Sequence, residues 1–374
     1  PVIDLGFEPQ WIFIKHIDSG AGGGDSSFIF DNMRGVVTGG GDPSLSPNAG
    51  NDEQNASNDM LDFNASGFQL KRANSDVNGN NNNYIYVAIR RGPLAVPEDA
   101  TKVFAMTSHA GGYSSLRGGK NHLRTNQSNS EGTNSPAPVS FDYINSGIKT
   151  QLYNSSNNVL WSMWKRAPGY FDVCCYNGNG STSQNVSHNL DVRPEMMWVK
   201  CRSDSDDWIV YHSGTGEGKY LRLNATGAAA NWTGAWNDTT PSQSVFTVGN
   251  GNAVNVSGRT YVAYLFATAE GVSKVGSYTG NGSGGGATQT IDCGFSSGAR
   301  FVLIKRTSTG SWFIFNTVRG IVSSTEPHLT LETTDAEVSG NDSIDPHSSG
   351  FTVVQNGTTE INSTGQTYIF YAIA

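Results

Sequence analysis

The five residues at positions 176–180 return at positions 278–282, with the same tyrosine, glycine, asparagine and glycine at the first, third, fourth and fifth places. The surrounding chain stays in step, since residues 197–200 correspond to 303–305 and Trp208 corresponds to Trp312. Both segments end on matching apolar runs at residues 260–264 and 367–371. A repeat of about 100 residues has the length of a small domain, so the chain is built from copied modules.

The first 95 residues form a further copy that matches the last copy best. Ile3 and Asp4 correspond to Ile291 and Asp292, and the apolar run at residues 84–89 corresponds to 368–373. Between them lies a divergent unit with a long polar loop. We therefore predict four units at residues 1–95, 96–169, 170–271 and 272–374. The first copy lacks the opening strand, which would leave an unpaired sheet edge. We expect that residue 1 is not the natural start, unless another subunit supplies that strand.

Short apolar runs separated by polar turns predict an all-β chain with little helix. The runs at residues 11–14, 27–31, 68–70 and 84–89 are three to six residues long. The chain has 45 glycines, and glycine, Asn, Ser and Thr are abundant in the intervals. This pattern favours strands joined by turns. The expected fold is a series of tandem antiparallel β-sandwiches of jelly-roll or concanavalin-like type.

Composition excludes several partners and cofactors. A net charge of −8 argues against nucleic acid, which binds clustered Lys and Arg, and no apolar run is long enough for a membrane span. The four cysteines lack metal-binding spacing, so we expect no metal and no other cofactor. An acidic loop could hold calcium, but it lacks the ligand spacing of a calcium motif, and solvated loop charge is the favoured interpretation. Its carboxylates are Asp52, Glu53, Asp59 and Asp62.

Two groups of tryptophans are candidates for glycan binding. Trp208 and Trp312 recur at one place in the repeat, where we align Phe28 of the first copy, and a recurring apolar position indicates core. Trp232 and Trp236 lie four apart in a polar stretch without counterpart, flanked by Asn231 and Asp238; Asn237 is also there. Exposed aromatic rings stack on sugars, and neighbouring amides and carboxylates hydrogen-bond them. The alternative is packing on the flank of the sandwich or at a subunit contact.

No catalytic arrangement is visible in the sequence. There is no GxSxG motif, no phosphate-binding GxxxxGK[ST] motif and no alternating carboxylates on a strand. We therefore expect that the chain is not an enzyme.

Several segments together resemble the repeat module of bacteriophage virion structural proteins, in particular tail-fibre-like proteins of marine phages. They are residues 164–173, 194–200, 275–282, 294–295 and 304–306. The similarity extends over about residues 6–93 and 163–374. The resemblance implies a β-sandwich appendage of a virus particle, cut from a longer fibre, and it brings no catalytic residues.

The expected function is that of a virion structural protein, a tail fibre or capsid-attached fibre with a role in host-surface adhesion. It would be exposed on the particle, outside the cell, and would contact other virion proteins, a host-surface glycan and copies of itself, most plausibly as a trimer. One alternative is an array of glycan-binding modules on a secreted or cell-surface bacterial protein. A second alternative is a tailspike that depolymerises polysaccharide.

Overall fold

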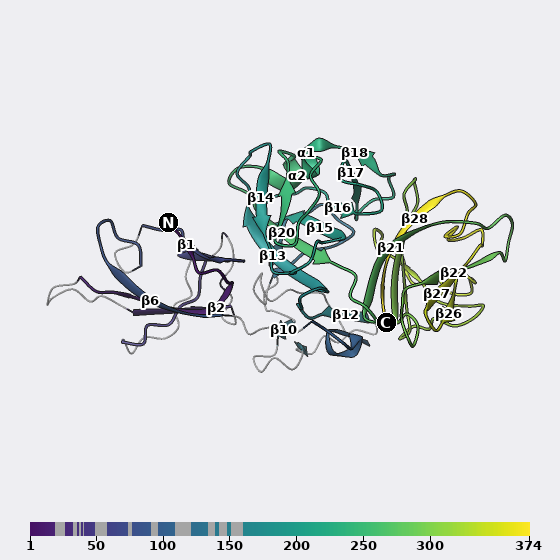
Figure 1. The fold of residues 1–374 in the computed structure, drawn as a ribbon, viewed down its shortest axis with the longest axis horizontal. Coiled ribbons are helices and arrows are strands. Elements are labelled where there is room, and N and C mark those ends of the chain that lie inside the picture. The colour runs from purple at the N-terminus through teal and green to yellow at the C-terminus, as the bar shows by residue number, and fades with distance from the viewer. Residues whose placement is uncertain are drawn as a thin grey trace.

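The computed structural model describes residues 1–18, 27–32, 36, 39, 41–48, 58–73, 77–90, 96–108, 121–133, 139–141, 148–150 and 160–374. Nearly all regular structure in this part of the chain is antiparallel β-sheet, which confirms the predicted all-β fold with little helix. No sheet among the described residues crosses a predicted unit boundary. We name the units 1 to 4 in chain order, and Figure 1 shows unit 1 standing apart at the end of the molecule that carries β6.

Unit 1 is a sandwich of two three-stranded sheets. Their orders are β1-β5-β4 and β3-β2-β6. The strands are β1 (Val2–Asp4), β2 (Pro9–His16), β3 (Ser27–Asp31), β4 (Leu61–Asn64), β5 (Gly67–Leu70) and β6 (Tyr84–Arg90). Ile12 and Ile14 on β2 share a core with Leu61 and Phe68 of the facing sheet. They alternate with side chains of the opposite face because successive residues of a strand point to opposite sides.

Unit 2 is smaller, and its main sheet is the pair β7-β12. Its elements are the 3-10 helix η1 (Ala100–Lys102), β7 (Phe104–Ser108), β8 (Asn121–His122), β9 (Gly132–Thr133), β10 (Val139–Phe141), β11 (Ile148–Thr150) and β12 (Leu160–Trp164). Asp99 caps η1 by accepting the N–H of Thr101.

Unit 3 packs a sheet of order β13-β20-β15-β16-β17-β18 against the pair β14-β19. The strands are β13 (Phe171–Asn177), β14 (Gln184–Ser187), β15 (Met196–Cys201), β16 (Ile209–His212), β17 (Lys219–Arg222), β18 (Ala230–Asn231), β19 (Val245–Val248) and β20 (Thr260–Phe266). Two single-turn helices, α1 (Thr233–Trp236) and α2 (Asn252–Asn255), cover its rim. Val199 and Tyr211 share the sandwich core with Phe246 of the smaller sheet.

Unit 4 repeats this architecture with sheets of order β21-β28-β23-β24-β25 and β22-β27-β26. Its strands are β21 (Ser273–Thr279), β22 (Thr288–Asp292), β23 (Phe301–Arg306), β24 (Trp312–Asn316), β25 (Leu329–Thr330), β26 (Ile344–His347), β27 (Gly350–Val354) and β28 (Thr367–Ile373). No helix in the described part of the chain has the length and apolar character needed to cross a membrane.

The tyrosine of the repeated motif fastens the opening strand to the closing strand of the same unit. Tyr176 stacks on Tyr261 with ring centroids 5.1 Å apart, and its hydroxyl donates to the carbonyl of Val254 at 2.7 Å. Tyr278 stacks on Tyr368 at 4.9 Å and also donates to a backbone carbonyl. The recurring tyrosine is therefore a structural residue, since its hydroxyl is satisfied inside the fold.

The glycine two positions after the tyrosine recurs because the backbone there passes close to another segment. A Cβ on Gly178 would lie 2.2 Å from the carbonyl oxygen of Val256, and one on Gly280 would lie 2.3 Å from that of Ser363. Backbone atoms cannot move aside as a flexible side chain can, so only glycine fits at either position.

Candidate interaction site between units

The large sheets of units 3 and 4 pack against each other through the side that points away from each sandwich core, here called the outer face. The outer face of unit 3 consists of Met196, Trp198, Lys200, Trp208, Val210, His212, Val262, Tyr264 and Phe266. That of unit 4 consists of Phe301, Leu303, Lys305, Trp312, Ile314, Ile369, Tyr371 and Ile373. The rings of Phe266 and Tyr371 lie 5.0 Å apart across this joint, and both faces contribute to one hydrophobic cluster. These strands are therefore apolar on both sides because two different cores meet at them.

A tryptophan at matching positions ties each of these units to the unit before it. Trp312 donates its indole N–H to the carbonyl of Arg222 in unit 3 at 2.9 Å, and Trp208 donates to the carbonyl of Arg124 in unit 2 at 2.8 Å. Both side chains are buried. A buried indole N–H needs an acceptor, and in both cases the acceptor belongs to the preceding unit.

A lysine beside each tryptophan makes the second contact of the joint. The Lys305 ammonium donates to the carbonyl of Thr226 in unit 3 at 3.3 Å and to two carbonyls of its own hairpin at 2.9 and 3.2 Å. Lys200 donates to the carbonyl of Ser128 in unit 2 at 3.1 Å. Desolvation lowers the pKa of Lys305 to about 8 and also lowers that of Lys200. The carbonyl dipoles satisfy the donors of these buried ammonium groups.

Two backbone hydrogen bonds complete each joint at equivalent positions. In the joint of units 3 and 4, the Gly310 N–H donates to Thr226 at 2.9 Å and the Ala229 N–H donates to Thr307 at 2.7 Å. In the joint of units 2 and 3, the corresponding bonds are Asp206 N–H to Ser128 and Glu131 N–H to Arg202, both at 2.8 Å. The two joints therefore share four hydrogen bonds, counting those of the tryptophans and lysines, so the docking geometry is itself repeated.

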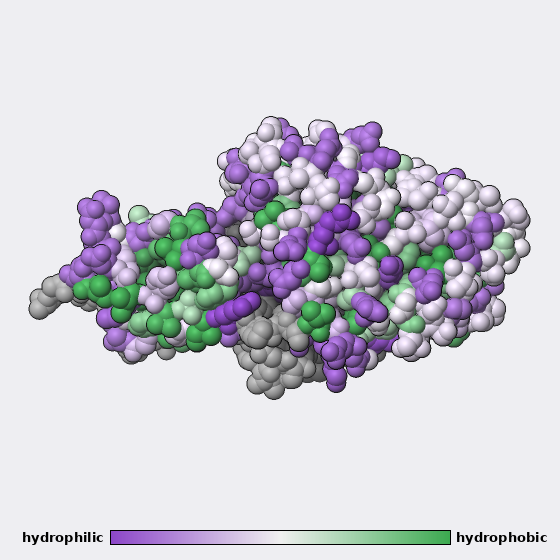
Figure 2. Space-filling model, in the orientation of Figure 1, coloured by the Kyte–Doolittle hydropathy of each residue, from purple (hydrophilic) through white to green (hydrophobic). Residues whose placement is uncertain are grey.

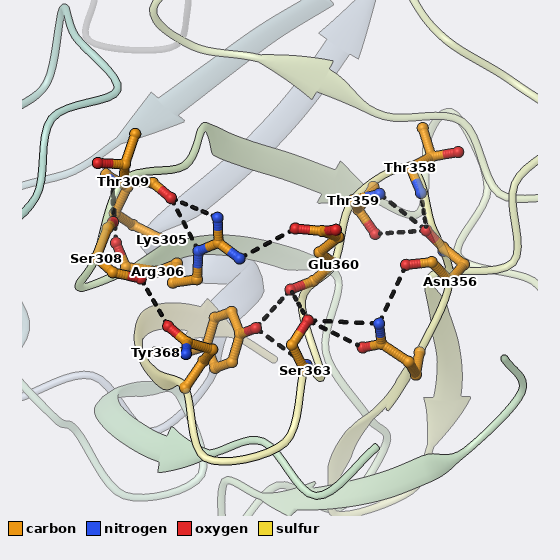
Figure 3. A network of polar contacts seen from close by, with 12 residues as sticks. Lys305, Arg306, Ser308, Thr309, Asn356, Thr358, Thr359, Glu360, Ser363 and Tyr368 are labelled. Atoms are coloured by element: carbon orange, nitrogen blue, oxygen red, sulfur yellow. Dashed lines mark hydrogen bonds and ion pairs between the residues drawn. The ribbon is translucent and has the colours of Figure 1, made fainter. Parts of the chain in front are cut away.

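The hairpin that carries Lys305 is braced from within unit 4 (Figure 3). The Arg306 guanidinium donates to the carbonyl of Thr309 at 2.9 Å and to the Glu360 carboxylate at 3.0 Å. The Ser363 N–H donates to the hydroxyl of Tyr368 at 3.0 Å, and that hydroxyl donates in turn to the Glu360 carbonyl. The loop around Glu360 therefore holds the hairpin in the shape that presents Lys305 to unit 3.

Units 2 and 4 also touch, so that each of units 2, 3 and 4 contacts the other two. Phe104 and Trp164 of unit 2 lie 5.5 and 5.7 Å from Phe301 in an edge-to-face arrangement. The Thr125 hydroxyl donates to the carbonyl of Leu331 at 3.5 Å. Apolar side chains of units 2, 3 and 4 thus share one buried cluster.

A neutral histidine lies at the joint of units 3 and 4. His212 is fully buried, its Nδ1 accepts the N–H of Gly214 at 3.0 Å, and its Nε2 lies 3.4 Å from the carbonyl oxygen of Phe370. This pattern puts the ring proton on Nε2, where it is donated to unit 4. Burial lowers the pKa of His212 to about 4, because a charged imidazolium would be desolvated.

Unit 1 is attached differently, through polar contacts at its edges. Arg166 of unit 2 forms ion pairs with Glu8 of unit 1 at 2.6 Å and with Asp172 of unit 3 at 2.5 Å. Asn177 of unit 3 donates to Asp62 of unit 1 at 3.0 Å. The two carboxylates around Arg166 hold its pKa above the usual range despite burial. These contacts between unit 1 and units 2 and 3 do not involve the outer face of the β3-β2-β6 sheet.

The alignment of Phe28 with the two recurring tryptophans is wrong by one residue. Lys15 pairs with Ser27 across β2 and β3, as Lys305 pairs with Trp312 across β23 and β24. Phe28 therefore points into the core of unit 1, where it is buried. A shift of one position moves a strand residue to the opposite face, which similarity of residue type alone does not reveal.

The predicted glycan-binding residues lie together around α1, but they are not all exposed. Trp236 is buried against Tyr211, and its indole N–H donates to the carbonyl of Lys219 at 3.1 Å. The expectation that this ring is exposed is therefore wrong, since the short helix turns it inward. Trp232 is half-buried and lies 5.0 Å from Tyr220. Asn231 and Asp238 are exposed on either side.

Of the acidic residues considered for calcium, Asp52 and Glu53 lie outside the described residues. Asp62 forms an ion pair with Lys71 at 3.1 Å. Desolvation, and then the charge of Asp62, raises the pKa of Asp59 to about 6. Within the described ranges no group of three or more His, Cys, Asp or Glu side chains is placed to hold a metal ion.

The segments that accept the joints were missed in the sequence, although a signal for them exists. Residues 123–128 read Leu-Arg-Thr-Asn-Gln-Ser and residues 221–226 read Leu-Arg-Leu-Asn-Ala-Thr, 98 positions later. The shared Leu, Arg, Asn and hydroxyl residue mark the two stretches whose carbonyls receive the tryptophan and lysine. The opening motif repeats after 102 positions and these segments repeat after 98, so aligning the chain on the opening motif does not reveal them.

Comparison with known proteins gives a family and no described function. A family model described as a domain of unknown function, DUF7483, matches residues 1–93 and 101–374. Searches of curated proteins and of solved structures gave no significant match.

Proposed function

The chain belongs to the DUF7483 family, and we propose that it is a structural protein of a bacteriophage particle, a tail fibre or capsid-attached fibre that contributes to adhesion to the host surface. The observation that carries the proposal is the repeated joint. Tandem sandwiches that dock through the same tryptophan and lysine contacts form a stiff body with little freedom between units. Stiffness combined with variable loops suits an exposed appendage.

The partners and location follow from this role. The protein would be exposed on the particle and outside the cell, in contact with other virion proteins and with copies of itself. The loops that differ between units, such as the stretch around Trp232, would face a host glycan. We propose no chemical step for the chain.

Particle composition tests the proposal directly. Mass spectrometry of purified particles from a culture that expresses this gene should detect the chain in a fixed ratio to the major capsid protein. Immunogold labelling should then place it on the outside of intact particles. Absence of the chain from particles, together with neighbouring genes that encode no capsid, portal or tail protein, would refute the role.

One observation favours the alternative of a glycan-binding array. Asn231 and Asp238 are exposed beside the half-buried ring of Trp232, which leaves part of an aromatic face next to hydrogen-bonding groups. Glycan-array binding by the purified chain, lost in Trp232→Ala and retained in a variant of an unrelated exposed residue such as Val318→Ala, would support it. A Trp236→Ala variant is unsuitable because that side chain is buried.

A further inference from the structure

Unit 1 forms a separate lobe whose contacts with the rest of the molecule differ in kind from those of the other joints. Figure 2 shows hydrophilic residues on the visible face where this lobe meets units 2, 3 and 4, together called the body. Each hydrophobic cluster of the described residues lies either within unit 1 or within the body. The three units of the body, in contrast, share one cluster. The lobe is therefore held without a common apolar core.

The backbone does not link unit 1 to the body either. Among the described residues, every backbone–backbone hydrogen bond of unit 1 stays within unit 1. Two such bonds cross the joint of units 2 and 3, and two cross that of units 3 and 4. Polar side chains that separate regain hydrogen bonds to water, whereas apolar surfaces that separate are exposed to water at a cost. Opening the joint of unit 1 therefore costs less free energy than opening a joint within the body.

A clamp around one carboxylate fastens the lobe to the body. Arg166 donates through Nη1 and Nη2 to the two carboxylate oxygens of Glu8 at 2.8 and 2.6 Å, and through Nε to Asp172 at 2.5 Å. The side chain of Asn189 donates to the same Glu8 carboxylate at 3.0 Å. A bidentate pair of this kind fixes the relative orientation of its partners. Glu8 belongs to unit 1 and the other three residues belong to the body, so the hold of the clamp on unit 1 depends on one side chain.

Packing beside the clamp is incomplete. A cavity of about 30 Å³ lies next to Arg166, between Val36 and Phe63 of unit 1 and Val173 and Cys175 of unit 3. An interface packed to the density of a protein core would leave no such space. The side chains around a void lack contact atoms on one side, so they lose part of their dispersion attraction. The apolar residues at this joint therefore add little to the hold of the clamp.

We infer that unit 1 is a movable head: the clamp acts as a latch, and unit 1 swings away from the body as a folded lobe when the bonds between Arg166 and Glu8 break. Relative motion of domains is expected unless the interface between them is large and hydrophobic. When the latch is open, Arg166 keeps Asp172 as its partner and Glu8 is hydrated, so neither charge is left buried and unpaired. The core of unit 1 contains residues of that unit alone, so the lobe keeps its fold. This motion is a property of the chain in solution and does not depend on the virion role.

The test uses the purified full chain and its native thiols. Cys175 is half-buried and lines the cavity beside the clamp, so opening of the latch exposes it. Alkylation with N-ethylmaleimide, followed by peptide mass spectrometry, gives a rate at each cysteine. In Glu8→Gln the rate at Cys175 should rise at least about tenfold, because charged hydrogen bonds are lost. The rates at Cys201 and Cys293, which are buried in the cores of units 3 and 4, should not change. Small-angle X-ray scattering should show a larger radius of gyration for this variant than for the parent.

The matched control is Glu131→Gln, which removes an ion pair of similar burial from a joint within the body. The side chains of Glu131 and Glu8 are 10% and 12% exposed, and each pairs with an arginine of another unit. The joint of units 2 and 3 also has the shared apolar cluster and two backbone hydrogen bonds, so the radius of gyration should match that of the parent. Scattering is the readout for this control, because Arg202, the partner of Glu131, interacts electrostatically with Cys175.

Hydrogen exchange separates opening of the lobe from unfolding of the lobe. The strands β4 and β5 contribute to the core of unit 1, and their exchange in Glu8→Gln should equal that of the parent. The inference is overturned if either the Cys175 rate or the radius of gyration of Glu8→Gln stays at the parent value. It is also overturned if β4 and β5 exchange faster in this variant, or if Glu131→Gln expands the chain equally.

Discussion

Replacing Trp312 by phenylalanine tests whether the joint between units 3 and 4 contributes to the free energy of unfolding. The phenylalanine keeps an aromatic ring at a site that is 1% exposed, but it removes the N–H that bonds the Arg222 carbonyl at 2.9 Å. The hydrogen bond is part-buried, and its loss costs about 1–3 kcal/mol. The smaller ring leaves space in a packed site, which adds about 1–2 kcal/mol. We therefore expect Trp312→Phe to lower the free energy of unfolding by about 2–5 kcal/mol.

Urea unfolding followed by circular dichroism gives the total effect, and hydrogen exchange shows where it falls. Because donor and acceptor lie in different units, exchange should accelerate both around β17 in unit 3 and around β24 in unit 4. The strands β4 and β5 of unit 1 should exchange as before, since they belong to a separate core. Native exchange resolves such local openings.

Trp232→Phe is the matched control, because that ring is half-buried and packs on Tyr220 of its own unit. It should cost only about 1–2 kcal/mol, because it removes ring volume packed against the core of unit 3 but leaves the Arg222 hydrogen bond in place. A loss below about 0.5 kcal/mol for Trp312→Phe, or accelerated exchange confined to unit 4, would refute the view that the indole stabilises the joint.

Three further predictions concern other contacts. Arg166→Met leaves the buried Asp172 carboxylate without its cation and should cost about 3–5 kcal/mol in urea unfolding. The exposed Arg222→Met loses a surface ion pair and a contact with the Tyr220 ring, and it should cost less than about 1 kcal/mol. Equal losses would contradict the assignment. The folded pKa of His212 is about 4 against 6.5 in the unfolded chain, so the stability that it contributes is complete above pH 6.5 and is lost as pH falls towards 4. The urea midpoint should drop between pH 7 and 5, and His212→Gln should flatten part of that slope; an unchanged slope would sink the idea. Gly280→Ala should cost at least about 1–3 kcal/mol by thermal unfolding, because its Cβ meets a backbone oxygen.

Local chemistry accounts for the parts of the fold that could be predicted. The short apolar runs of β2 and β15, the glycine- and asparagine-rich turns and the recurring tyrosine motif act within one unit. Gly178 and Gly280 show this clearly, because their requirement for a missing Cβ is a property of a crossing inside each sandwich. The all-β class and the burial of Trp208 and Trp312 could therefore be predicted from the pattern.

The candidate glycan site shows where such reasoning stops. Trp232 and Trp236 have the same residue type and lie on the same polar stretch, yet one ring is half-buried and the other is fully inside. The difference comes from the single turn α1, which directs Trp236 onto Tyr211. A polar neighbourhood in the sequence does not reveal which way a short helix faces.

By itself, the sequence determined that this protein consists of copied β units, because short apolar runs between polar turns form strands and the tyrosine and glycine of the opening motif serve contacts inside a single unit. Only the tertiary structure decided how the units dock. Trp198 on the outer face and Val199 on the inner face are both apolar, so the pattern cannot distinguish a sandwich core from a joint. The partners of Trp312 and Lys305 lie 90 and 79 positions away. A backbone carbonyl accepts a hydrogen bond whatever side chain its residue carries, so the recurring residues of the accepting segments do not indicate which side chains bond to them. For the same reason, the outer face of the β3-β2-β6 sheet in unit 1 is recognised only by comparison with the buried outer faces of units 3 and 4.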